Sequence, residues 1–130
     1  MKMNTILLVE DDPFLIDIYT TKLKEAGFNV EVVSDGEECL EKIKQNNLQK
    51  KEIWPDLLVL DIVLPRIDGW EVLKEIKADK SLKDLKVVVL SNLGQKAEVE
   101  KGISLGVIKY LIKAHFTPSE VVEEIKKTLK

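Results

Sequence analysis

Four short apolar runs in this sequence are each followed directly by residues with a carboxylate, hydroxyl or ammonium group. These residues are Glu10 and Asp11, Asp61, Ser91 and Lys113. Short apolar runs that alternate with helical stretches are typical of buried parallel strands. Because the carboxyl ends of parallel strands share one edge of the sheet, where ligands bind, we expect these side chains to converge on one pocket.

The side chains expected in this pocket are suited to phosphoryl transfer. Carboxylates from Glu10, Asp11 and Asp61 would repel one another unless a cation lay between them, and Mg²⁺ prefers such oxygen ligands. Lys113 would attract an anion and Ser91 would donate a hydroxyl hydrogen. Together with the metal, Lys113 would neutralise charge on a transferring group, with Asp61 as the nucleophile.

The same residues have a structural interpretation. Acids at strand ends are often helix caps, as we expect for Asp12, and a lysine near acids can be a simple ion pair. A single acid would favour that interpretation. Convergence of four strand ends favours a functional site, because charge clusters concentrate at such sites.

Composition excludes several classes of protein. The chain has 130 residues, of which 45% are apolar, which is enough for one compact domain with a core. The net charge is −3 with interleaved lysine and glutamate, so we expect no direct binding to nucleic acid. No apolar stretch approaches membrane-spanning length, and the N-terminus does not resemble a signal peptide. A single cysteine, Cys39, which we expect to be buried, favours a cytoplasmic location.

The pattern along the chain predicts five repeats of a strand followed by a helix. Helix starts are indicated by Asp12 before Pro13, by a capping-box spacing from Ser34, by another from Asp68, and by Thr117 before Pro118. The predicted strands cover residues 5–9, 29–33, 56–60, 86–90 and 109–112. The predicted helices begin near residues 13, 35, 69, 95 and 118. Residues 45–55 form a longer connection, either an extension of the second helix or a surface excursion.

Several motifs, taken in order, resemble the receiver domain of two-component response regulators. They are LLVEDD at 7–12, DLLVLDIVLP at 56–65 with Asp68-Gly69, LS at 90–91 and YLIK at 110–113. The resemblance covers essentially the whole chain. It implies a flavodoxin-like, doubly wound α/β fold with a five-stranded parallel sheet in the order 2-1-3-4-5. It also implies one receiver domain over residues 1–130, with no effector domain in this chain.

The resemblance assigns roles to the residues of the site. Asp61 would accept a phosphoryl group from a histidine kinase or a phosphotransfer protein, so the chain would be a signalling phosphoacceptor rather than an enzyme. Asp11 and Asp61 would bind Mg²⁺ directly, the carbonyl group of Val63 would add a ligand, and Glu10 would act through water. Lys113 would pair with the phosphoryl oxygens.

A switch is also implied by the resemblance. Ser91 would bond the phosphoryl oxygens after transfer, and the ring of Tyr110 would turn inward as Ser91 moves. That shift would reshape the face formed by the helix at 95–105, the strand at 109–112 and the helix from 118. The changed face would regulate a downstream protein partner, with the chain a monomer or a weak, phosphorylation-dependent dimer.

This sequence departs from the family pattern at three places. Ala114 follows Lys113 where the family usually has proline, so the 113–114 bond is either trans or strained. Asn92 replaces a small residue and is expected to crowd access to the phosphate. Residues 107–109 are valine, isoleucine and lysine in place of acids, which predicts a more apolar and basic output face.

Two further positions bear on the lifetime of the phosphoryl group. Val63 and Leu93 stand where the family governs access of the hydrolytic water, and neither side chain can orient a water molecule. The prediction is a long-lived phosphoryl aspartate.

Three other functions are open to the same sequence. A haloacid-dehalogenase-like phosphohydrolase would need a second acid at position 63, which is valine. A flavin carrier would need a hydroxyl- and glycine-rich phosphate loop where Asp11, Asp12 and Pro13 stand. A receiver that no longer takes phosphate could act as a scaffold, although the retained acids, hydroxyl and lysine argue against it.

Overall fold

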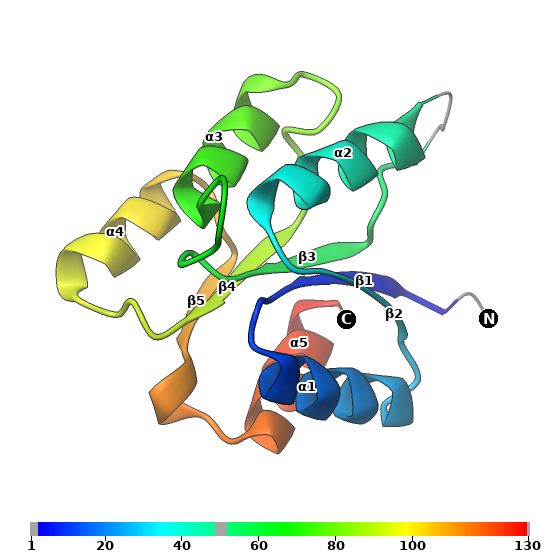
Figure 1. Ribbon diagram of the computed structural model, residues 1–130, viewed down its shortest axis with the longest axis vertical. Helices are drawn as coiled ribbons and strands as arrows, with labels where there is room; N and C mark the ends of the chain where they lie inside the picture. Colours follow the sequence, from blue (N-terminus) through cyan, green and yellow to red (C-terminus); the bar gives the residue numbers. More distant parts are fainter. Residues whose placement is uncertain (1–2, 49–51, 130) are drawn as a thin grey trace.

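The computed structural model describes residues 3–48 and 52–129, which form a parallel sheet between two layers of helices (Figure 1). The sheet has the strand order β2-β1-β3-β4-β5, which confirms the predicted topology. The strands are β1 (Thr5–Val9), β2 (Asn29–Val33), β3 (Leu57–Leu60), β4 (Val87–Ser91) and β5 (Lys109–Ile112). The helices are α1 (Pro13–Glu25), α2 (Gly36–Asn47), α3 (Gly69–Ala78), α4 (Lys96–Ser104) and α5 (Pro118–Thr128), with a 3-10 turn, η1 (Lys113–His115).

Helices cover both faces of the sheet, which explains why the central strands are continuously apolar. Helices α1 and α5 lie on one face, and α2, α3 and α4 lie on the other (Figure 1). Alternate residues of a strand point to opposite faces, so Leu7 and Val9 pack in one core while Ile6 and Leu8 pack in the other. No helix within the described residues is long and apolar enough to cross a membrane.

Most helix starts follow the predicted capping residues. The carboxylate of Asp12 accepts from the backbone N–H of Phe14 at 2.9 Å, and Pro13 is the first residue of α1. At α5, Thr117 and Glu120 form the complete capping box. These caps fix where α1 and α5 leave the edge of the sheet.

The predicted cap of α2 is wrong by one residue. Asp35, not Ser34, is the N-cap, and its carboxylate accepts from the backbone N–H of Glu38 at 2.8 Å. Ser34 and Asp35 each stand three residues before a glutamate, so the sequence offers two equivalent capping spacings. Gly36 is then the first helical residue, and a side chain there would collide with the carbonyl oxygen of Ile67 at 1.9 Å.

The long connection after α2 begins with an extension of that helix. The side chain of Asn47, at the end of α2, donates to the carbonyl oxygen of Trp54 at 2.7 Å and accepts from the Trp54 N–H at 2.9 Å. Ile53 and Trp54 pack against the core, which closes the connection onto the sheet. Residues 49–51 of this connection lie outside the described residues.

Candidate functional site

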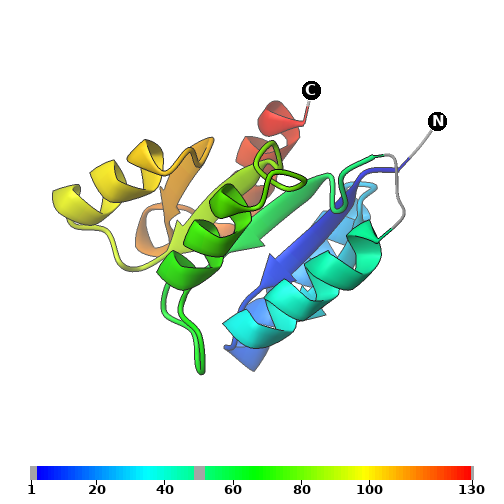
Figure 2. The same cartoon turned by 90° about the horizontal axis from the view of Figure 1, so that it is seen from above.

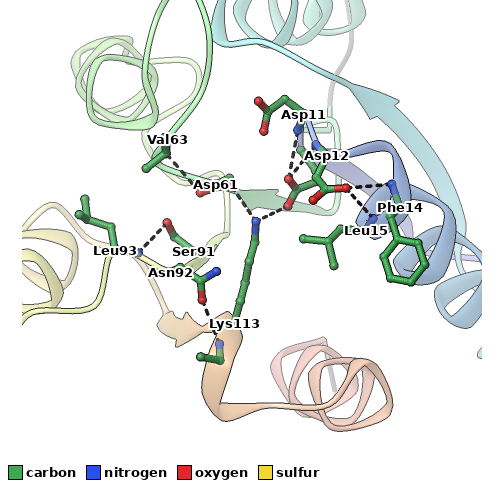
Figure 3. Close-up of polar contacts among 12 residues, drawn as sticks. Asp11, Asp12, Phe14, Leu15, Asp61, Val63, Ser91, Asn92, Leu93 and Lys113 are labelled. Atoms are coloured by element: carbon green, nitrogen blue, oxygen red, sulfur yellow. Dashed lines mark hydrogen bonds and ion pairs between the residues drawn. The ribbon is translucent and has the colours of Figure 1, made fainter.

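The carboxyl ends of the strands form a polar pocket at one edge of the sheet. Figure 2 shows the strands running in one direction, with the loops before α3 and α4 leaving the same edge. The pocket contains the acids, hydroxyl and ammonium that the sequence placed at strand ends (Figure 3). Its lining residues are Glu10, Asp11, Asp12, Leu15, Asp61, Val63, Ser91, Asn92 and Lys113.

Strand register explains why residues so distant in sequence meet here. Val9 of β1 is paired with Leu60 of β3, so Glu10 and Asp61 follow side by side. The N–H of Asp61 continues the pairing by donating to the carbonyl of Val9 at 3.1 Å. Further along the same sheet, Ser91 of β4 is paired with Ile112 of β5, the residue before Lys113.

A buried ion-pair network lies at the centre of the pocket. The ammonium of Lys113 lies 2.5 Å from Glu10 Oε1 and 2.7 Å from Asp61 Oδ2. The side chains of Lys113, Glu10 and Asp61 are only 10%, 2% and 6% exposed. Removing one charge from such a buried network is costly, because the remaining charges would be left unpaired and out of contact with water.

Backbone groups fix the remaining carboxylate oxygens. Glu10 Oε2 accepts from the N–H groups of Asp11 and Asp12, both at 3.1 Å. Asp61 Oδ1 accepts from the N–H of Val63 at 3.2 Å. Each of the two buried acids therefore has one oxygen bound to Lys113 and the other bound to the loop that follows its strand.

Burial and pairing shift the pKa values of this network. Burial raises the pKa of Glu10, and the hydrogen bonds from Lys113 and from the Asp12 N–H oppose that rise only in part. Burial alone would lower the pKa of Lys113, but its hydrogen bonds to Asp61 and Glu10 outweigh that effect and leave the pKa raised. Lys113 therefore stays protonated across the neutral range.

The carboxylates also form a group that could hold a metal ion. Oxygen atoms from Glu10, Asp11 and Asp61 all lie within 4.8 Å of one another. Glu10 and Asp61 are buried, whereas Asp11 is exposed. This all-oxygen donor set suits a hard divalent cation that keeps part of its water shell.

Ser91 and Tyr110 are connected through one backbone residue. The buried Ser91 hydroxyl oxygen accepts from the N–H of Leu93 at 3.2 Å, and the Tyr110 hydroxyl donates to the carbonyl of Leu93. Tyr110 packs so closely on Gly102 that a β-carbon there would lie 2.8 Å from the ring. Burial, with the nearby charge of Glu98, raises the pKa of Tyr110 to about 12. The hydroxyl groups of Ser91 and Tyr110 are thus bonded to the N–H and the carbonyl of the same residue, Leu93.

The loop after β5 contains a contact that the motifs did not predict. The amide oxygen of Asn92 accepts from the N–H of Ala114 at 3.0 Å. Within the described residues the cis peptide bond is Trp54–Pro55, so the bond after Lys113 is trans. The two departures in sequence, an amide at 92 and a non-proline residue at 114, were the available signal.

The predicted character of residues 107–109 needs correction. Val107 is buried and belongs to the core beside α3, so it adds nothing to the output face. Ile108 is 44% exposed and does add apolar surface. Lys109 forms an ion pair with Glu124 of α5 at 3.1 Å, so its positive charge is matched.

Similarity to known sequences covers nearly the whole chain. Residues 6–126 match the family described as the response regulator receiver domain. The DNA-binding dual master transcriptional regulator RpaA of Synechocystis is 32% identical over 98% of this chain and 50% of its own length. The alkaline phosphatase synthesis regulator PhoP of Bacillus subtilis is 32% identical over 96% of this chain and 48% of its own. The chain therefore spans about half the length of these curated relatives.

Solved structures agree with the sequence matches. The phosphorylated cyanobacterial phytochrome response regulator RcpA has a TM-score of 0.81 and 32% identity, covering 98% of this chain and 91% of its own. The Mn²⁺-bound response regulator Rcp1 has a TM-score of 0.82 and 30% identity, covering 95% and 92%. Family match, sequence relatives and fold point the same way: this chain belongs to the response regulator receiver domains.

Proposed function

We propose that the chain works as the phosphoacceptor of a two-component relay, in which Asp61 takes a phosphoryl group from a histidine kinase or a phosphotransfer protein. The observation that carries this proposal is the buried Asp61 carboxylate, 2.7 Å from the ammonium of Lys113 and beside two further acids. The chain would accept one phosphoryl group per signalling event rather than turn over a substrate.

The transfer would be a displacement at phosphorus. A carboxylate oxygen of Asp61 attacks the phosphorus of a phosphohistidine, forming a P–O bond as the P–N bond breaks. The electron pair of the broken bond stays on the imidazole nitrogen, which then takes up a proton. Lys113 supplies positive charge next to the attacking carboxylate, where the transferred oxygens would lie.

Divalent metal is part of the proposal. Mg²⁺ held by Asp11, Asp61 and the carbonyl of Val63, with Glu10 acting through water, would neutralise negative charge on the transferring group. The close carboxylate group supports this assignment. The similar response regulator Rcp1, solved in a Mn²⁺-bound form, supports it as well.

Ser91 and Tyr110 are proposed as the switch. A phosphoryl oxygen on Asp61 would accept a hydrogen bond from the Ser91 hydroxyl, and the shift of Ser91 toward it would pull on the Leu93 N–H that donates to the same hydroxyl oxygen. The carbonyl of Leu93 accepts from the Tyr110 hydroxyl, so this movement would reach Tyr110. Phosphorylation would thereby favour one packing of the face formed by α4, β5 and α5. That face would contact a downstream protein target or, weakly, a second phosphorylated copy.

The phosphoryl aspartate is predicted to last for minutes or longer. The Val63 side chain is exposed but apolar, and Leu93 is partly buried against the core. Neither can hold a water molecule in line with the phosphorus. Rapid loss of the phosphoryl group in Mg²⁺ buffer, with no phosphatase present, would contradict this prediction.

Intact-mass measurement tests the proposed function directly. The protein is incubated with a phosphoramidate donor, with and without Mg²⁺, beside an Asp61→Asn variant. We expect one phosphoryl adduct that requires Mg²⁺ and is missing from the variant. An adduct that persists in Asp61→Asn would place the acceptor elsewhere, and no adduct in the wild type with Mg²⁺ bound would contradict a phosphoacceptor role.

A further inference from the structure

Asn92 and Ala114 form a bridge between the two loops that carry Ser91 and Lys113. The bridge is the 3.0 Å hydrogen bond from the Ala114 N–H to Asn92 Oδ1. It needs a residue other than proline at 114, which supplies the N–H, and a side-chain acceptor at 92. The residues directly before them, Ser91 and Lys113, line the pocket.

The bridge also fixes which way the Asn92 amide faces. A backbone N–H must meet the carbonyl oxygen of the amide, so the NH₂ group is the end left over. Asn92 lines the same pocket as Asp61 and is exposed, and Figure 3 shows it beside Ser91 and Lys113. Among the described residues no hydrogen bond takes up this NH₂ group, so its two N–H donors remain available to a group bound in the pocket.

We propose that Asn92 is a further binding residue of the phosphoacceptor site, whose NH₂ group, held by Ala114, donates to an oxygen of the group carried on Asp61. This inference rests on the proposed function, because it names how the same site recognises its anion. Hydrogen bonds to charged acceptors are stronger than neutral ones, and an amide already turned by a second bond loses little freedom on binding. If Asn92 only obstructed the pocket, removing its side chain would strengthen binding of the anion instead of weakening it.

Binding of beryllofluoride, an unreactive mimic of the phosphoryl group, is the first measurement. The whole chain is titrated by calorimetry at saturating Mg²⁺. We expect Asn92→Ala to bind on the order of tenfold more weakly than the wild type, with unchanged Mg²⁺ affinity. Asn92→Asp keeps the acceptor for Ala114 but replaces the donor with an anionic oxygen, so it should bind more weakly still. Unchanged or tighter binding in Asn92→Ala would overturn the proposal.

Substitutions at 114 test the anchor separately. Ala114→Gly keeps the N–H and should bind as the wild type does, whereas Ala114→Pro removes it and should weaken binding. In a double-mutant cycle, Ala114→Pro should add little to the loss already caused by Asn92→Ala. Fully additive losses would overturn the anchoring role.

The outcomes also separate this inference from the proposed function. If the wild type forms the phosphoryl adduct but the Asn92 variants bind beryllofluoride as tightly as the wild type does, only the role of Asn92 fails. If the wild type neither binds beryllofluoride nor forms an adduct, the proposed function fails and this inference fails with it.

Discussion

Replacing Lys113 with methionine should destabilise the protein at neutral pH in the absence of divalent ions. Methionine keeps most of the length and apolar contact of the lysine stem but removes the ammonium. Glu10 and Asp61, which are 2% and 6% exposed, would then be two buried acids without a cation. Two neighbouring carboxylates in this environment repel each other and lose solvation together.

The expected loss is about 3 kcal/mol at pH 7. Removing one partner of a buried ion pair costs about 3–5 kcal/mol in general. The pocket opens to solvent on one side, and Lys113 is itself 10% exposed, so the lower end applies. With a urea slope of about 1–3 kcal/mol per molar, the unfolding midpoint should fall by about 1–3 M.

The difference in stability between Lys113→Met and the wild type should change with pH in a definite direction. Burial already raises the pKa of Glu10, and without the opposing hydrogen bond and charge of Lys113 this pKa should rise further. A raised acid pKa contributes stability below the unfolded pKa, and that stability is lost as pH rises through the folded pKa. The wild type keeps the contribution of Lys113 throughout this range, because the pKa of Lys113 is raised and its contribution is lost only at alkaline pH. The gap between variant and wild type should therefore widen from pH 4.5 to pH 7.

Urea unfolding in chelator-treated buffer at several pH values measures this gap. Lys109→Met is the matched control, since it removes another lysine of the same strand region whose ion pair with Glu124 lies nearer the surface. We expect the control to change stability little at any pH. Equal stability of Lys113→Met and wild type at pH 7, or a gap that widens toward pH 4, would refute the reasoning.

Three other substitutions test the support around the site. Gly69→Ala should destabilise the protein by roughly 2 kcal/mol or more in urea unfolding and slow phosphorylation, because its β-carbon would lie 2.5 Å from the carbonyl oxygen of Asp61. Thr117→Ala should lower stability by about 1 kcal/mol through loss of the α5 cap, with Mg²⁺ affinity unchanged by calorimetry. Tyr110→Phe should lose the hydrogen bond to Leu93 and about 1 kcal/mol of stability in the same urea assay; no change would show that this bond contributes nothing.

The fold could be predicted from local sequence patterns, and the errors of that prediction were confined to single residues. Buried parallel strands read as apolar runs, and a chain that alternates such runs with capped helices has few possible topologies. The error at Ser34 arose because Ser34 and Asp35 each stand three residues before a glutamate, so spacing alone does not say which of them caps α2. Val107 was assigned to the surface because hydrophobicity alone does not say which side of a loop faces the core.

The convergence of site residues followed from one rule about strand ends, but their pairing did not. No sequence rule says that Lys113 bonds Glu10 as closely as Asp61, since that depends on the reach of a flexible side chain in a packed pocket. The contact between Asn92 and Ala114 was harder still. Taken alone, Asn92 looked like the loss of a small residue and Ala114 like the loss of a proline. Only the three-dimensional structure shows that the side-chain oxygen of Asn92 accepts from the N–H of Ala114. Paired departures from a family pattern are therefore best interpreted together, because a change that removes one interaction can supply the partner for another.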